Sequence, residues 1–248
     1  MSTQQLKAPK RNGRVTIIVN AKVKQEGRLI AASPVTERMI TALKQAILHN
    51  LPQTVVEVVA VATLWSEAAQ RQTPIVGQIF CPLTIQLPHW LVFPGQKIYQ
   101  VCQDIAGYRR WVTTQFGCLS HPQDQGLGDR WLPIIWTGQG PLYGEVIGEG
   151  MMPNAYQQPI ELEENLRQQL QTLAFNCLEA AQAPPSVYLL QFSLLDKTIL
   201  FDRLWPFPAA PAIASLGIQE PDLFTCHWLC LNDQPLPDVK ILNRQATL

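Results

Sequence analysis

The chain has 248 residues, of which 47% are hydrophobic and 15% are charged, and 19 basic residues balance 19 acidic ones. This composition is typical of a folded protein with a sizeable core and excludes an intrinsically disordered chain. A neutral chain without a dense basic face gives no electrostatic reason to expect a nucleic acid partner or an anionic membrane surface.

No targeting or membrane-spanning segment is recognisable. Residues 1–13 are polar, and the apolar run at 15–23 is interrupted by Asn20 and Lys22, which excludes a signal peptide. No apolar run approaches the length of a membrane span. We therefore expect a soluble cytoplasmic protein, with no membrane contact, that begins with a flexible tail over residues 1–13.

The first half of the chain, residues 14–117, contains strand and helix patterns in alternation. Residues 15–23 alternate as in a strand, and residues 28–32 return toward it. Ser33-Pro34 has the residue types of an N-cap and first helical position, and the helix that follows ends near Asn50.

Two more strands and a helix complete this half. Residues 55–64 are almost continuously apolar and β-branched, which predicts a strand buried on both faces. Residues 75–87 alternate, and Pro82 within them indicates an edge strand or a bulge. A second helix is expected over 98–112, with Gly107 weakening its middle.

The second half, residues 131–248, follows a polar loop at 118–130. Short apolar runs predict two hairpins, one over 131–147 and one over 187–204. Between the hairpins, an apolar stripe predicts a helix whose core residues are Leu166, Leu170 and Leu173. A proline-rich passage then leads to a last short helix between Pro221 and Asn232.

The order of elements is thus two strands and a helix, repeated four times. Hairpins separated by helices predict an α+β fold, with a mainly antiparallel or mixed sheet covered by helices. Four ββα units also suggest two pseudo-duplicated halves, 14–117 and 131–248, joined by the loop at 118–130. One compact domain with the same elements remains an alternative.

Six cysteines are present, and two of them raise the question of a metal site. Cys226 and Cys230 lie four residues apart, on one face of the last helix. Structural zinc needs a second close pair, and the other four cysteines are isolated at 81, 102, 118 and 177. We therefore expect free thiols that pack in the core, no bound metal and no cofactor.

The strand exit at residues 202–207 is the predicted site. Asp202 and Arg203 are adjacent on an otherwise apolar strand, so one charge lies among apolar side chains whichever face is buried. A half-buried carboxylate can serve as a ligand, a base or a metal anchor, or it can simply accept backbone hydrogen bonds. Trp205 and Phe207 follow, each with a proline after it that stiffens the backbone.

A second candidate contact surface combines two arginines with aromatic side chains. Arg109 and Arg110 lie between Tyr108 and Trp111. Such a cluster could bind an anion or stack on a partner, or it could be the solvated side of a helix. The expected ligand or partner contacts are therefore six residues, none of them assigned a catalytic role: Asp202, Arg203, Trp205, Phe207, Arg109 and Arg110.

Residues 200–236 resemble the carboxy-terminal part of ATP-grasp ligases. There a strand ends in an acidic metal ligand, and a proline-rich turn and a helix follow; the resemblance implies that Asp202 lies near the metal position. The Asn and Arg that the family pattern places around this carboxylate are absent, because Phe201 and Pro206-Phe207 occupy the region. The amino-terminal nucleotide-binding lobe of the family is not evident in the sequence, and no ligase activity is inferred from the resemblance.

The sequence contains no catalytic, metal or nucleotide signature, and this determines the functional expectation. We expect a non-catalytic accessory or assembly factor that acts through contacts with a protein partner. The alternative is a small-molecule-binding protein or enzyme with a pocket around Asp202, Arg203 and Trp205.

Overall fold

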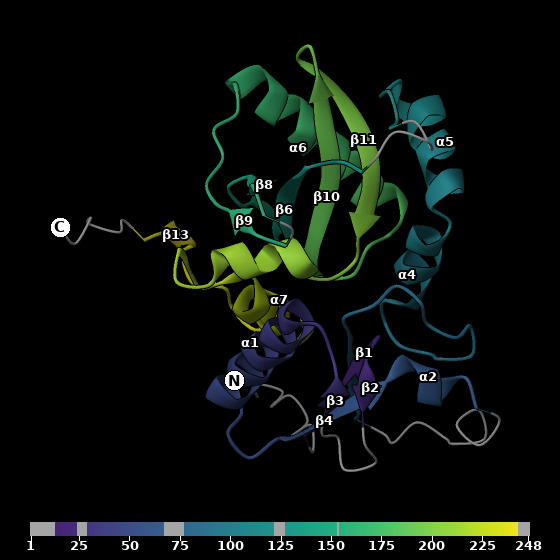
Figure 1. The fold of residues 1–248 in the computed structure, drawn as a ribbon, viewed down its shortest axis with the longest axis vertical. Helices are drawn as coiled ribbons and strands as arrows, with labels where there is room; N and C mark the ends of the chain where they lie inside the picture. The colour runs from purple at the N-terminus through teal and green to yellow at the C-terminus, as the bar shows by residue number, and fades with distance from the viewer. Residues whose placement is uncertain (1–12, 24–28, 67–76, 122–126, 153, 243–248) are drawn as a thin grey trace, which may run out of the picture.

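The computed structural model describes residues 13–23, 29–66, 77–121, 127–152 and 154–242. Two sheets of different kinds are stacked along the long axis of the molecule (Figure 1). The smaller sheet lies at one end of the molecule and the larger sheet lies at the other. The last helix and a short 3₁₀ helix lie between them.

The smaller sheet is parallel, in the order β4-β1-β5. Its strands are β1 (Arg14–Val19), β4 (Val55–Ala60) and β5 (Ile79–Pro82). Helix α1 (Pro34–Asn50) connects β1 to β4. The side-chain oxygen of Ser33 accepts a 3.1 Å hydrogen bond from the backbone N–H of Thr36, which confirms the predicted N-cap.

Three details of this region differ from the sequence-based expectation. The predicted strand over 55–64 ends at Ala60 and continues as the short helix α2 (Val61–Leu64). β4 is an edge strand, and Val55 is 59% exposed, so the strand is not buried on both faces. The return strand does not join this sheet, because β2 (Lys22–Val23) and β3 (Leu29–Ala31) pair only with each other.

The predicted strand over 75–87 is much shorter in the structure than in the sequence analysis. It is reduced to β5, while residues 67–76 lie outside the described part of the chain. Pro82 ends β5, which is the second edge strand of the sheet, as its missing N–H predicted.

The helix predicted over 98–112 is two helices, α4 (Gln96–Gln103) and α5 (Ile105–Phe116). Asp104 separates them and caps the second, because its side chain accepts a 2.9 Å hydrogen bond from the N–H of Gly107. A Cβ atom at position 107 would lie 2.0 Å from Oδ2 of Asp104. The missing side chain of Gly107 therefore allows α5 to begin at this point. The low helix propensity of glycine predicts a weak point in a helix, but not the start of a new one.

The larger sheet is antiparallel and has the order β11-β10-β6-β8-β9, with β7 also pairing with β6. Its strands in chain order are β6 (Arg130–Thr137), β7 (Gly140–Tyr143), β8 (Ile147–Glu149), β9 (Tyr156–Gln157), β10 (Ser186–Leu195) and β11 (Thr198–Trp205). Helix α6 (Glu164–Ala180) buries Leu166, Leu170 and Leu173, which confirms the predicted apolar stripe.

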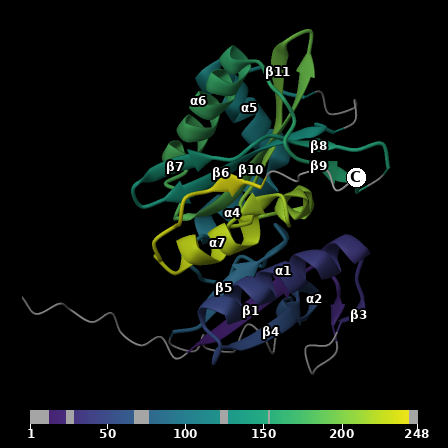
Figure 2. The ribbon, with the colours of Figure 1, turned by 90° about the vertical axis from the view of Figure 1, so that its left-hand side faces the viewer.

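The segment after β11 connects the two sheets. It forms the 3₁₀ helix η1 (Ala210–Ser215), strand β12 (Gln219–Glu220), helix α7 (Leu223–Leu231) and strand β13 (Lys240–Ile241). Helix α7 contacts α1 on one side and strands β10 and β6 on the other (Figure 2). The carboxy-terminal segment thus joins the sheets through a shared apolar core.

The observed fold is a mixed α/β arrangement with an antiparallel sheet and helices, as expected in outline. Four ββα units and a duplication are not confirmed, because the first sheet is parallel and the second is antiparallel. Helices α4 and α5 also contact β11 of the second sheet. The division of the chain into 14–117 and 131–248 stays a prediction, and residues 122–126 of its joining loop lie outside the described residues.

Cys81, Cys102 and Cys177 are buried free thiols, as their apolar neighbours predicted. Within the part of the chain that the structure describes, no helix is both long and apolar enough to cross a membrane.

Candidate functional site at the exit of strand β11

A β-bulge places Asp202 in the interior of the protein. The pairing of β10 with β11 jumps from Gln191–Arg203 to Phe192–Phe201, so Asp202 has no partner residue opposite it. Bulges re-aim side chains and occur often beside functional sites. The carboxylate is 0% exposed, whereas the neighbouring Arg203 is half-buried.

Both oxygens of the Asp202 carboxylate have partners. Oδ1 accepts hydrogen bonds from a terminal nitrogen of Arg109 and, at 3.1 Å, from Nε of Arg203. Oδ2 accepts a 2.7 Å hydrogen bond from the backbone N–H of Gly128. Nε of Arg109 also donates to the backbone carbonyl of Asp202 at 2.8 Å, so one guanidinium contacts two groups of the same residue.

Two segments position these donors. Arg109 projects from α5, and its backbone carbonyl accepts a 3.0 Å hydrogen bond from the hydroxyl of Ser120. Gly128 lies against β10, where a Cβ atom would come within 2.8 Å of the backbone of Phe192. A glycine is therefore needed at position 128 for the backbone N–H to reach the carboxylate.

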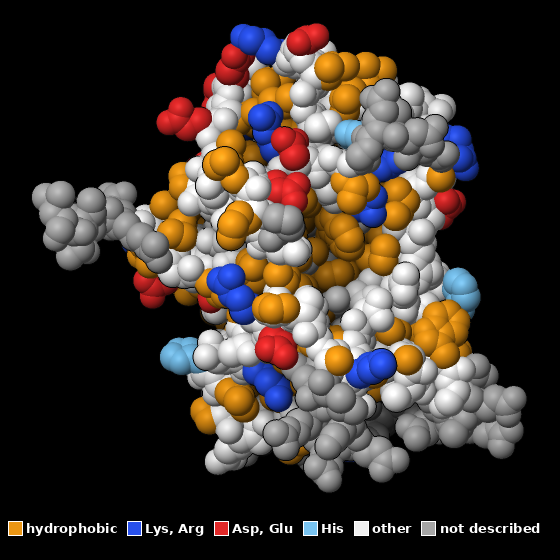
Figure 3. Space-filling model, in the orientation of Figure 1, with side chains coloured by type: hydrophobic (Ala, Val, Ile, Leu, Met, Phe, Trp, Pro, Cys, Tyr) orange, Lys and Arg blue, Asp and Glu red, His pale blue; other side chains and the backbone are white. Residues whose placement is uncertain are grey.

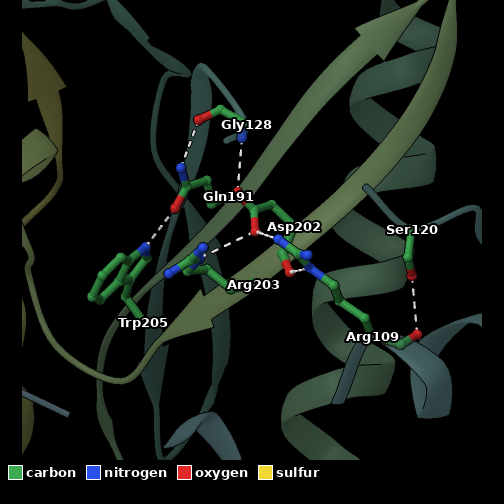
Figure 4. A network of polar contacts seen from close by, with 7 residues as sticks. All are labelled: Arg109, Ser120, Gly128, Gln191, Asp202, Arg203 and Trp205. Atoms are coloured by element: carbon green, nitrogen blue, oxygen red, sulfur yellow. Dashed lines mark hydrogen bonds and ion pairs between the residues drawn. The ribbon is translucent and has the colours of Figure 1, made fainter. Parts of the chain in front are cut away.

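The network continues to the aromatic end of the strand (Figure 4). The side-chain amide of Gln191 donates to the carbonyl of Gly128 at 2.6 Å and accepts from Nε1 of Trp205 at 2.9 Å. The guanidinium of Arg203 lies 5.6 Å from the centre of the Trp205 ring, within the range of a cation–π contact.

Four of the six predicted site residues thus come together: Arg109, Asp202, Arg203 and Trp205. Phe207 is 2% exposed, and its ring lies edge-on to Trp205 with a centroid distance of 6.0 Å. It therefore supports Trp205 from the core. Arg110 is exposed on α5 and lies outside this network, so its role as a contact stays a prediction.

Sequence reasoning missed Gln191 and Gly128. Gln191 is 3% exposed in the middle of an apolar strand, and this interruption of the apolar pattern was the available signal. Gly128 lies within the polar loop predicted at 118–130, where nothing in the sequence distinguishes it. Only the folded chain shows that its N–H and its C=O both contact the network.

The residues around Asp202 do not fit a metal ion. The resemblance to ATP-grasp ligases placed Asp202 near a metal-binding position, but both carboxylate oxygens already have donors and two of these donors are cations. The part of the chain that the structure describes contains no group of three or more His, Cys, Asp or Glu side chains that could hold a metal.

Comparison with known proteins gives the fold a context. No family model and no curated protein matches the sequence. Among solved structures, N5-carboxyaminoimidazole ribonucleotide synthetase from Thermus thermophilus is similar at a TM-score of 0.64 and 13% identity, over 90% of this chain and 79% of that one.

Two further structures show the same fold. N5-carboxyaminoimidazole synthase from Aspergillus clavatus, in complex with ADP and 5-aminoimidazole ribonucleotide, is similar at a TM-score of 0.60 and 10% identity, over 92% and 78% of the two chains. A putative ATP-grasp superfamily protein from Archaeoglobus fulgidus is similar at 0.55 and 8% identity, over 92% and 90%.

These likenesses correct the functional expectation drawn from the sequence. A non-catalytic assembly factor that acts through protein contacts is the wrong interpretation, because along most of its length the chain shares its fold with a ribonucleotide synthetase, a synthase that holds ADP and a putative ATP-grasp superfamily protein. The absence of a recognisable motif does not exclude such a fold, because these structures share it at only 8–13% identity. The alternative, a small-molecule-binding protein or enzyme, is the better supported one.

Proposed function

We propose that this protein binds a purine nucleotide at the exit of β11, with Arg203 contacting the phosphate groups and Trp205 contacting the base. The Aspergillus clavatus structure of the same fold holds ADP together with a ribonucleotide. A ligand of this kind combines anionic phosphates with a flat heterocycle. Arginine and tryptophan are the side chains best suited to these two parts.

The observation that supports the proposal is the way Arg203 is held. Its Nε donates to Asp202, and its guanidinium is near the Trp205 ring, so the side chain has little freedom left to lose on binding. Among the described residues, its two terminal nitrogens take no part in the contacts with Asp202. Those nitrogens can donate to a phosphate as a planar fork.

The charge of the network also favours an anion. Two guanidinium groups, Arg109 and Arg203, are balanced by one carboxylate, Asp202, which leaves one positive charge in a largely buried cluster. Because Asp202 does not fit a metal, Arg203 would neutralise phosphate charge directly. Binding should therefore be independent of magnesium.

The face that surrounds this site is apolar. Figure 3 shows hydrophobic side chains gathered across the middle of the molecule on the side where β10 and β11 face the viewer. Trp131 on β6 pairs with Gln191 in the sheet, and its ring packs edge-on against Tyr156. A base that stacks beside Trp205 would thus lie over a sheet face whose buried layer contains further aromatic side chains.

The test is isothermal titration of the full chain with ADP, with and without EDTA. We expect saturable binding that EDTA leaves unchanged, and a loss of affinity of at least about tenfold in Arg203→Ala and in Trp205→Ala, the effect of about one lost hydrogen bond or ring contact. Arg203→Lys should recover little, because lysine keeps the charge and loses the planar fork. Arg14→Ala, which removes a half-exposed arginine on the parallel sheet, is the matched control.

Two results would contradict the proposal. One is the absence of binding heat with both ADP and ATP. The other is a marked fall in melting temperature of Arg203→Ala and Trp205→Ala at unchanged affinity, which would make the strand exit part of the scaffold.

A further inference from the structure

A cavity of about 380 Å³ lies between β5, α4, the start of β10 and α7, where the two sheets meet. This volume lies within the range of roughly 300–1,000 Å³ that small-molecule sites occupy. Aromatic rings and prolines form much of its wall: Phe80, Phe93, Tyr99, Tyr188, Pro82, Pro94, Pro184, Pro185 and Pro206.

The cavity shares no residue with the Asp202 network. No lysine or arginine is among its described lining residues, and Asp233 at the end of α7 is exposed. Nothing among these lining residues would compensate the charge of a buried anion. The lining therefore favours an uncharged, flat and mainly apolar ligand.

His227 on α7 is the polar group that sets this cavity apart from an ordinary packing defect. The side chain is 1% exposed and lines the cavity. Its Nδ1 lies 3.0 Å from the hydroxyl of Ser186 and accepts a hydrogen bond from the backbone N–H of Val187 at 3.4 Å. A backbone N–H can only donate, so Nδ1 is unprotonated and the ring proton is on Nε2.

The N–H at Nε2 has no hydrogen-bond partner among the described residues, although it is buried. Leaving a buried donor unpaired is unfavourable, and native proteins rarely do so without a reason. Burial also holds the ring neutral, because it lowers the pKa of His227 to about 3. The nitrogen is thus a fixed neutral donor at physiological pH.

We infer that this cavity is a second ligand site, for an uncharged planar molecule whose carbonyl or ring-nitrogen acceptor receives the Nε2–H of His227. Ser186 acts as a positioning residue, because its hydroxyl at Nδ1 helps to fix the tautomer that presents the donor. Tyr99 closes part of the wall, and its own hydroxyl is already satisfied by the carbonyl of Pro82 at 2.9 Å. The inference is independent of nucleotide binding at β11.

A matched pair of probes tests the inference. Acetophenone has a carbonyl acceptor, and α-methylstyrene has nearly the same shape without it. Titrations followed by ¹H–¹⁵N NMR of the histidine rings should show acetophenone shifting His227 and binding about tenfold more tightly, the factor that one well-formed hydrogen bond supplies. Ser186→Ala should weaken acetophenone binding, while Arg203→Ala should leave it unchanged.

A crystal soaked with 4′-bromoacetophenone gives a second measurement that needs no variant. The anomalous bromine peak should lie in the cavity, with the carbonyl oxygen within hydrogen-bond distance of Nε2 of His227. Equal affinity for the two probes, or a bromine peak elsewhere, overturns the inference. A peak in the cavity without any shift of His227 in solution is binding at crystal concentration only and also overturns it.

Discussion

Arg109 on α5 and Asp202 on β11 form a buried ion pair across 93 residues of sequence. The Arg109 side chain is 10% exposed and the Asp202 side chain is 0% exposed. This pair attaches the helix to the edge of the antiparallel sheet. The pair also holds the Asp202 carboxylate, which orients Arg203. Asp202 therefore serves both the attachment of α5 to the sheet and the proposed nucleotide contact.

Removing the buried arginine should destabilise the protein strongly. Arg109→Met leaves Asp202 with one cationic partner fewer in the interior, and breaking a buried pair costs about 3–5 kcal/mol of unfolding free energy. Urea denaturation followed by circular dichroism measures it. Arg14→Met is the control, because the half-exposed, solvent-screened pair of Arg14 with Glu57 should contribute far less to stability. Equal losses in the two variants would show that burial of the pair is irrelevant.

The apolar stripe of α6 should be sensitive to truncation. Leu170 is 0% exposed, so Leu170→Ala should lower the free energy of unfolding by about 2–5 kcal/mol through lost transfer energy and the cavity left behind. Leu142→Ala on β7, where the side chain is 46% exposed, should lower it by less than half as much. The midpoint of urea denaturation measures both, and an unchanged midpoint for Leu170→Ala would mean that this helix face is not packed.

The paired cysteines of α7 should bind no structural zinc. Cys226 and Cys230 are both buried, and burial raises the pKa of Cys226 above its ordinary value and that of Cys230 to about 11. Thiols held protonated are poor zinc ligands. Elemental analysis of protein purified without added metal should show no zinc. A stoichiometric zinc signal that disappears in the Cys226→Ser and Cys230→Ser double variant would refute this.

His227 should make stability depend on pH in the acid range. Burial lowers its pKa to about 3 from the ordinary value of 6.5, so between these values the unfolded chain binds a proton that the folded chain does not. The unfolding free energy should therefore fall by about 1.4 kcal/mol per pH unit as the pH drops through this window. Above the window, the contribution of His227 to stability is complete. Burial raises the pKa of the neighbouring Cys230 and Tyr188, so neither titrates there.

The measurement is urea denaturation of the parent chain and of His227→Gln at several pH values between the two pKa values of the histidine. The parent should show the steeper loss, and the difference between the two slopes isolates the histidine. Parallel curves would mean that the imidazole takes up its proton in the folded protein as easily as in the unfolded one.

Most local elements could be predicted from the sequence alone. Ser33 specified the start of α1 because its hydroxyl can satisfy a helix N–H that has no other partner. The leucine stripe of α6 specified a buried face, and Pro82 specified a strand edge. The sequence also indicated that the strand end with Asp202, Arg203 and Trp205 is unusual, because charged side chains on an apolar strand need polar partners.

How these elements combine depends on contacts between segments that are far apart in the chain. A hairpin pattern at 15–32 could not show that β1 pairs in parallel with β4 and β5, because the pairing of strands far apart in sequence depends on the α1 crossover and its packing. The bulge at Asp202, the reach of Arg109 from α5 and the approach of Gly128 arise from segments distant along the chain. The unpaired Nε2–H donor of His227 also arises from tertiary packing, because other elements bury it away from water. No residue pattern within α7 alone predicts that burial.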